Sequence, residues 1–214
     1  MAKPGVRSRP SSAGSDRSAP TKQALVGAAI DVLKSEGFGG ASARAIAESA
    51  GCNQALIFYH FGTVADLLLA ALDEVSAMRR ARYEEVVAEV NSPAELLNAA
   101  ARIFREDLDS GHVAVLVAMI AGASSTPGLG PQVVERIEPW KQFAADAIAN
   151  AFGRDVLASV VPAEEVAHAI VALYLGLEML ADLDGDRAPA VAMFERAKSI
   201  AEFLGLVPRL HRNS

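Results

Sequence analysis

The chain has almost no cysteine and few aromatic residues. It contains one cysteine and one tryptophan among 214 residues, and aromatic residues make up 6% of the sequence. A single cysteine, Cys52, excludes an internal disulfide and is typical of a protein in a reducing compartment. Cys52 falls between two predicted helices, where a packing role is favoured and redox sensing is the alternative.

The residue patterns of catalysis and metal binding are also missing. None of the four histidines, His60, His112, His168 and His211, stands at metal-ligand spacing from another histidine or from the cysteine. The sequence has no glycine-rich phosphate loop, nucleophile elbow or Cys-x-x-Cys motif. The acidic stretch 182–186 lacks the downstream glutamate of a calcium loop. We therefore expect no catalytic residues, no metal and no cofactor.

Long hydrophobic runs are absent as well. The longest apolar run in the middle of the chain, 113–120 followed by 121–123, is too short to span a bilayer. His168 and Glu178 interrupt the next candidate, and no apolar N-terminal stretch suggests export. These features predict a cytoplasmic protein without a membrane partner.

The charge of the chain is distributed unevenly. The net charge is −6, but residues 1–62 hold seven Lys or Arg against four Asp or Glu, a net of +3. The other 13 basic and 22 acidic residues give −9. A basic end can approach phosphates while an acidic body repels them, so nucleic acid would be contacted at the N-terminal end only.

Apolar residues repeat at helical spacing from Thr21 onward, and no strand-like alternation appears. We predict an all-α fold of about nine helices, with breaks after Gly111, over 124–130 and at Pro139. Residues 1–20 are rich in Pro, Ser and Gly and carry four basic residues. Such a composition predicts a disordered basic tail, with a DNA-contacting arm as the alternative.

Residues 42–61, SARAIAESAGCNQALIFYHF, are the most informative segment. Ser42 is a candidate N-cap, Gly51 can adopt the left-handed turn that ends a first short helix, and Asn53 can cap a second. The second helix would point Ile57, Phe58 and Phe61 inward. This is the pattern of a DNA-binding helix-turn-helix, whose second helix enters the major groove.

The residues expected to face outward suit DNA. Gln54 in the first turn matches the donor and acceptor of adenine, and Leu56 could contact a thymine methyl. Tyr59 and His60 are placed for phosphate oxygens, whereas Arg44 could contact guanine or phosphate. The predicted DNA-binding residues are Arg44, Gln54, Ala55, Leu56, Tyr59, His60 and Thr63.

The order of these segments resembles the TetR family of one-component transcriptional regulators. The resemblance covers residues 21–72 and includes Glu36-Gly37-Phe38, Ala50-Gly51 and the run from Ile57 to Phe61. Two usual phosphate anchors are missing, because Phe58 lacks a tyrosine hydroxyl and Val64 stands where the family often has lysine. The resemblance implies a DNA-binding domain over 21–66 and a ligand-binding and dimerisation domain over 67–214.

The resemblance also implies a small-molecule pocket in the second domain. Its walls are expected to be largely apolar, with Tyr174 or His112 as polar anchor, although each wall residue could equally be core. The predicted ligand-binding residues are Phe104, Leu108, Met119, Trp140, Phe143 and Tyr174.

The predicted helix 163–182 is apolar around most of its circumference, which requires contacts on two sides. We expect a homodimer interface there and on 189–204, at Leu173, Leu177 and Phe194. The sequence therefore predicts a homodimeric repressor that binds a palindromic operator and is released by a small apolar ligand. The alternatives are a DNA-binding regulator without a ligand and a helical enzyme or scaffold unrelated to DNA.

Overall fold

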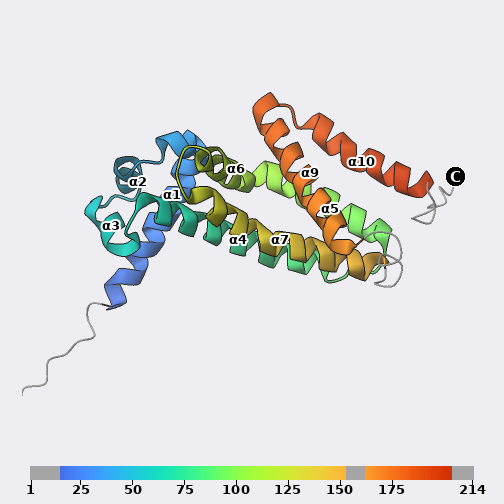
Figure 1. The fold of residues 1–214 in the computed structure, drawn as a ribbon, viewed down its shortest axis with the longest axis horizontal. Coiled ribbons are helices and arrows are strands. Elements are labelled where there is room, and N and C mark those ends of the chain that lie inside the picture. The colour runs from blue at the N-terminus through green and yellow to red at the C-terminus, as the bar shows by residue number, and fades with distance from the viewer. Residues whose placement is uncertain (1–14, 153–161, 204–214) are drawn as a thin grey trace, which may run out of the picture.

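The computed structural model describes residues 15–152 and 162–203, and every regular element in this part is a helix. The expected all-α fold is confirmed, with nine helices in the described part (Figure 1). They are α1 (Ser15–Gly40), α2 (Ala43–Ser49), α3 (Ala55–Phe61), α4 (Val64–Val87), α5 (Pro93–Ser110), α6 (His112–Ala123), α7 (Leu129–Phe152), α9 (Ala163–Asp184) and α10 (Ala188–Phe203).

The helices form an elongated molecule with different structures at its two ends. Figure 1 shows α2 and α3 at one end beside α1, and α9 and α10 toward the other. The long helices α4 and α7 run between these ends. The described part of the chain therefore separates the predicted helix-turn-helix from the predicted dimerisation helices.

The first helix differs from its prediction at its start. It begins at Ser15 rather than Thr21 and includes Pro20, so residues 15–20 are helical instead of disordered. Pro20 lies close to the helix start, where its missing N–H removes one early hydrogen bond without ending the helix. The rest of the predicted tail, 1–14, lies outside the described residues. At the other end Gly37, with φ of 67°, interrupts the helix where the sequence predicts its end.

The helix α7 was expected to begin at residue 131 and to be broken or kinked at Pro139. It begins at Leu129 and continues through Pro139 to Phe152. A proline removes one hydrogen bond and bends a helix, but packing of the flanking turns can keep the helix continuous. Val133, Ala145 and Ile148 are buried on either side of the proline, so both halves are held against the core.

The largest hydrophobic core extends from the N-terminal helices into α6 and α7. Leu25 and Leu33 of α1 and Leu68 of α4 share it with Val115 and Met119 of α6. Leu129 and Val133 of α7 close it on a further side. The expected boundary at residue 66 falls inside α4 and is not a break in this core.

Two contacts hold the end of α1 against α5 and α6. Lys34 Nζ donates to the Ser110 carbonyl at 3.3 Å. The Phe38 ring lies directly over Gly122, where a Cβ would overlap the ring atoms. Position 122 therefore requires glycine, because the Phe38 ring of α1 lies too close to α6 for any side chain there.

Gly122→Ala should consequently destabilise the protein by about 1–3 kcal/mol, the usual cost of overpacking a core. Gly27→Ala is the matched control, because nothing lies within 4 Å of its Cβ position and it is inside α1. That control should gain about 0.5–1 kcal/mol from helix propensity. Urea unfolding of both variants measures the difference, and an unchanged midpoint for Gly122→Ala would contradict the close approach.

No single helix within the described ranges is both long enough and apolar enough to cross a membrane. Within the same ranges, α3 and α4 taken together have the length and composition of a membrane span, but the two helices are bent by 68° relative to each other.

Candidate nucleic-acid interface and buried polar cluster

The turn between α2 and α3 is fixed by backbone hydrogen bonds. Ser42 Oγ accepts from the N–H of Ala45 at 3.2 Å and caps α2 as predicted. Gly51 has φ of 63°, and Cys52 N donates to the Ala47 carbonyl at 2.9 Å. This hydrogen bond spans six residues around the left-handed Gly51. It ends α2 and sets the direction of α3.

The starts of α3 and α4 are capped by side chains. Asn53 Oδ1 accepts from the N–H of Ala55 at 2.8 Å, so the predicted cap on α3 is present. Thr63 Oγ1 accepts from the N–H of Asp66 at 3.0 Å, and its hydroxyl donates to the Asp66 carboxylate at 2.6 Å. The carboxylate at this helix start disfavours a phosphate close to Thr63.

The outward face of α3 differs in part from the prediction. Gln54, Ala55 and Tyr59 are exposed as expected, with Tyr59 79% exposed. The predictions for two other residues were wrong, because Phe58 is 51% exposed whereas Leu56 is half-buried against the main core. His60, also expected outward, and Phe61 are half-buried.

Helix geometry explains these corrections. Successive residues are about 100° apart, so the i+3 step from buried Ile57 returns His60 to the inner side at about 60°. Phe58 and Leu56 both lie about 100° from Ile57, one on each edge. The core covers only the Leu56 edge, and this leaves the Phe58 ring in solvent beside Gln54 and Tyr59.

Two basic side chains flank this face. Arg44 is exposed on α2. Lys22 Nζ lies 5.5 Å from the centre of the Phe61 ring, at the end of α3. Sequence reasoning missed Lys22 and the exposed Phe58. Lys22 is in the first part of the helical pattern, but only tertiary packing of α1 brings it next to Phe61.

Gln54→Ala should weaken binding by about 1–3 kcal/mol at a single base position and relax the preference there. Tyr59→Phe should instead weaken all sequences alike, because a hydroxyl on phosphate carries no base information. Binding to a selected DNA site and its single-base variants measures both effects. Gln54→Ala with an unchanged base preference would rule out this docking of α3.

A cluster of buried polar side chains joins α4, α5 and α9. Arg79 Nη2 contacts Asp107 Oδ2 at 2.5 Å, and the Asp107 carboxylate also accepts from the hydroxyls of Tyr83 and Tyr174. The Arg79 guanidinium lies over the Tyr83 and Trp140 rings, 5.4 and 5.3 Å from their centres. Burial raises the pKa of Tyr174, so its hydroxyl stays a donor. Helices α4, α5, α7 and α9 thus meet around one ion pair.

Glu178 of α9 lies beside this cluster. It is 3% exposed, and its Oε1 has no hydrogen-bond partner among the described residues. Burial, followed by the nearby Asp107 charge, raises the pKa of Glu178 to about 7. Burial, followed by the charges of Lys34 and Arg79, lowers the pKa of His112, so this predicted polar anchor is held in its neutral form.

The structure brings together some of the predicted ligand-binding residues and separates others. Phe104 and Tyr174 stack edge to face at 5.4 Å, with Leu108 in the same apolar cluster. Trp140 and Phe143 lie 6.3 Å apart in a second cluster around Tyr83. Met119 is fully buried in the main core beside the N-terminal helices and lies with neither group.

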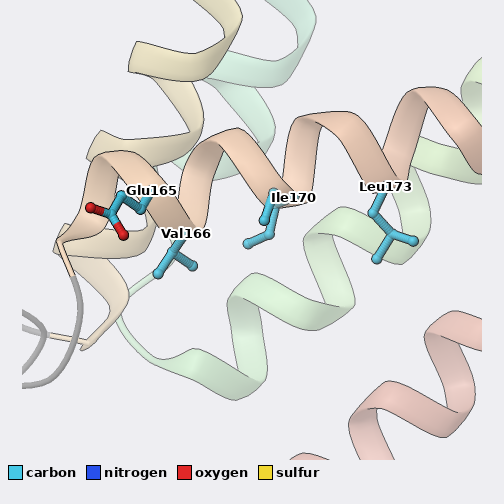
Figure 2. A pocket seen from close by; sticks show the side chains of 5 residues that line it. Glu165, Val166, Ile170 and Leu173 are labelled. Carbon is cyan, nitrogen blue, oxygen red and sulfur yellow. The ribbon is translucent and has the colours of Figure 1, made fainter.

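Two open hollows lie near these clusters. One, of about 390 Å³, is a groove lined by α9 residues, and Figure 2 shows Val166, Ile170 and Leu173 projecting into it. The other, of about 470 Å³, is lined by α4, α7 and the segment after α4, and includes Phe143. Among the described residues, no group of His, Cys, Asp or Glu could hold a metal ion.

The predicted dimer residues fall in two environments. Leu173 is 53% exposed, whereas Leu177 and Phe194 pack in the same cluster as Phe104 inside the protomer. The exposed apolar residues of α9 instead follow a stripe along one side of the helix. This outer stripe consists of the exposed residues Ala169, Leu173, Leu180 and Leu183, with the half-buried Gly176 between them.

In the described part of the chain, which is all-helical, α3 follows a capped left-handed turn and faces outward. This arrangement is that of a helix-turn-helix DNA-binding protein. Over residues 25–71 the chain matches the sequence model of the bacterial regulatory proteins of the tetR family. This match over the helix-turn-helix supports the TetR family of transcriptional regulators.

Solved structures support the same fold. A TetR-family transcriptional regulator from Rhodococcus sp. is 21% identical, with TM-score 0.71, over 85% of this chain and 98% of that one. A TetR-family member from Streptomyces coelicolor A3 is 25% identical, with TM-score 0.60, over 82% and 96%. The fatty acid degradation regulator FadR from Bacillus halodurans is 14% identical, with TM-score 0.71, over 91% and 98%. No curated protein matches the chain.

Proposed function

We propose that this regulator is a homodimeric cytoplasmic repressor that binds a palindromic operator and is released by a small, largely apolar ligand. The exposed face of α3 carries the proposal: Gln54 and Phe58 offer base contacts, and Tyr59 offers a phosphate contact. Arg44 and Lys22 add positive charge beside this face.

Two-fold pairing is supported by the outer stripe of α9. Leu180 and Leu183 are 63% and 79% exposed, which is costly for leucine in water and is relieved when a second copy covers them. A single helix-turn-helix reads only a few base pairs, so pairing also supplies specificity.

Ligand control is supported by the apolar α9 groove and by the polar cluster behind it. The second candidate, a regulator without a ligand, is favoured by the complete burial of Phe104 and Met119. These two predicted walls have no space beside them for a bound molecule unless the helices move apart.

Selection of DNA from a random library with the full chain tests the proposed function. We expect an inverted repeat whose half-sites are about one helical turn, or a multiple of it, apart. Binding should weaken steeply with salt, because phosphate contacts release counterions. Recovery of no DNA sequence, or of sites without two-fold symmetry, would refute the proposal.

A Leu173→Glu and Leu180→Glu double variant should be a folded monomer, since both residues lie on the outer stripe. Val134→Glu is the control, because Val134 is 60% exposed on α7, away from the stripe, and should remain dimeric. A charge at Leu177 or Phe194 should instead unfold the protein, because both lie in its own core. Light scattering with circular dichroism separates these outcomes; a monomeric wild type would contradict the interface.

A further inference from the structure

Glu178 is a buried carboxyl group whose Oε1 has no hydrogen-bond partner in the described part of the molecule. Asp107 takes up the Arg79 guanidinium and two tyrosine hydroxyls, whereas Glu178 Oε1 accepts nothing. A hydrogen bond with Tyr174 and the charges of Arg79 and Arg187 favour the ionised side chain, but burial and the Asp107 charge outweigh them, so the unpaired Oε1 costs stability. Such a group is therefore suited to a role that needs an acceptor inside the protein.

The charges around Glu178 are short of one cation. Two carboxyl groups, Asp107 and Glu178, share the buried Arg79, whose guanidinium is already bound to Asp107. The other nearby cation, Arg187, is half exposed and pairs with Asp109 at the surface, 3.3 Å away. A cation brought next to Glu178 would complete the charge balance, whereas an anion would meet two carboxylates.

The α9 groove and Glu178 lie on one ridge of the same helix. Val166, Ile170, Tyr174 and Glu178 follow each other at four-residue spacing, one helical turn of about 5.4 Å per step. Exposure falls along the ridge, from 44% at Ile170 through half-buried Tyr174 to 3% at Glu178. Figure 2 shows Val166 and Ile170 among the side chains that line the groove.

We propose that Glu178 recognises the effector and that the effector is an organic cation, an amine or ammonium with an apolar body. The body lies in the groove against Ile170 and Leu173, and the cationic head reaches Glu178 past the Tyr174 hydroxyl. The edge-to-face rings of Phe104 and Tyr174 add an aromatic surface close to the head group. This inference rests on the proposed ligand control and names the ligand class for that site.

The groove and the outer stripe share Ala169 and Leu173. A second copy that covers the stripe would therefore form one wall of the groove, and a ligand in the groove would contact both protomers. Binding at this place can change the spacing of the two recognition helices, which is what release from DNA requires.

The test is calorimetry and thermal shift with the full chain and matched compounds. The panel consists of arylalkyl and alkyl amines and quaternary ammonium ions, each beside the alcohol and the carboxylate of the same skeleton. At least one amine should bind about tenfold or more tightly than its alcohol, because a charge-assisted hydrogen bond replaces a neutral one. The carboxylates should not bind.

Glu178→Gln, which keeps the shape and removes the charge, should bring amine and alcohol to equal affinity. Glu164→Gln is the matched control, because Glu164 is exposed on the same helix and should retain the preference. Amines that bind no better than their alcohols to the wild type, or a Glu178→Gln variant that keeps the preference, would overturn the inference. The wild-type comparison stands whether or not the variant folds.

Operator release separates this inference from the proposed function. A chain that selects a palindromic operator but does not prefer amines leaves the regulator intact and removes only the role of Glu178. A chain that binds amines through Glu178 but selects no DNA supports the ligand class and contradicts the proposed repressor. Amine binding with release of the operator supports both.

Discussion

Asp107→Ala should lower the free energy of unfolding by about 3–5 kcal/mol, because it leaves the Arg79 guanidinium buried without its counter-charge. Arg79 is only 8% exposed, and the variant also removes the acceptor for the Tyr83 and Tyr174 hydroxyls. Chemical denaturation at neutral pH measures the loss. The expected effect is large because side chains of α4 and α9 both bind this carboxylate of α5.

Asp109→Ala is the matched control for this prediction. Asp109 lies two positions further along α5, and its ion pair with Arg187 is exposed to solvent, so its loss should cost no more than about 1 kcal/mol. A double variant, Arg79→Met with Asp107→Leu, should recover much of the stability because no buried charge is left unpaired. Equal losses for Asp107→Ala and Asp109→Ala would show that the cluster does not support the fold.

Glu178→Gln should become more stable than the wild type as the pH rises from about 4.5 to about 7. The pKa of Glu178 is about 7 in the folded protein, against an ordinary value of 4.5. Between these values the folded protein keeps a proton that the unfolded chain has released, so the wild type loses stability with rising pH. The full difference, about 3 kcal/mol, should be present above pH 7.

The measurement is a series of unfolding curves for both proteins across this pH window. The pKa of His112 is also shifted, downward by burial, but this residue is unchanged in the variant, so its contribution largely cancels in the difference between the curves. Parallel curves would mean that Glu178 keeps an ordinary pKa in the folded protein. Such a result would also remove the electrostatic reason for a cation beside it.

Much of the fold could be predicted from the sequence because its signals are local. Ser42, Gly51 and Asn53 each act on backbone groups a few residues away, and all three do so in the structure. The start of α5 has the same kind of local signal, with Ser92 Oγ accepting from the N–H of Glu95 and Pro93 in the first turn. Capping depends on nearby atoms only, so one sequence suffices to place it.

The orientation of α3 side chains was harder to predict. A short helix has few residues that define its inner face. If that face is placed one residue too early or too late, residues at its edge are assigned to the core instead of to solvent. Phe58 was expected on the inner face with Ile57 and Phe61, but the neighbouring helices leave its side of α3 uncovered. Which edge is covered depends on how α1 and α4 pack, and the α3 sequence does not contain that information.

The polar cluster could not be predicted for a related reason. Arg79 belongs to a charged segment of α4 that has the composition of a solvated helix face. Its partner Asp107 is 28 residues away, and Tyr174 and Glu178 are on a helix much later in the chain. Only tertiary packing brings these residues together, so no spacing rule marks them as a site.

The DNA-reading end of this protein is not a transferable module. Val115, Met119 and Leu129 complete the core behind α1 and α4, so the segment 21–66 separated from the chain would leave its inner leucines exposed to water. A chimera that joins it to another regulator would need a partner with a glycine opposite Phe38 and apolar residues in the same register. A substitution on either side of this shared core is therefore expected to require matching changes on the other side.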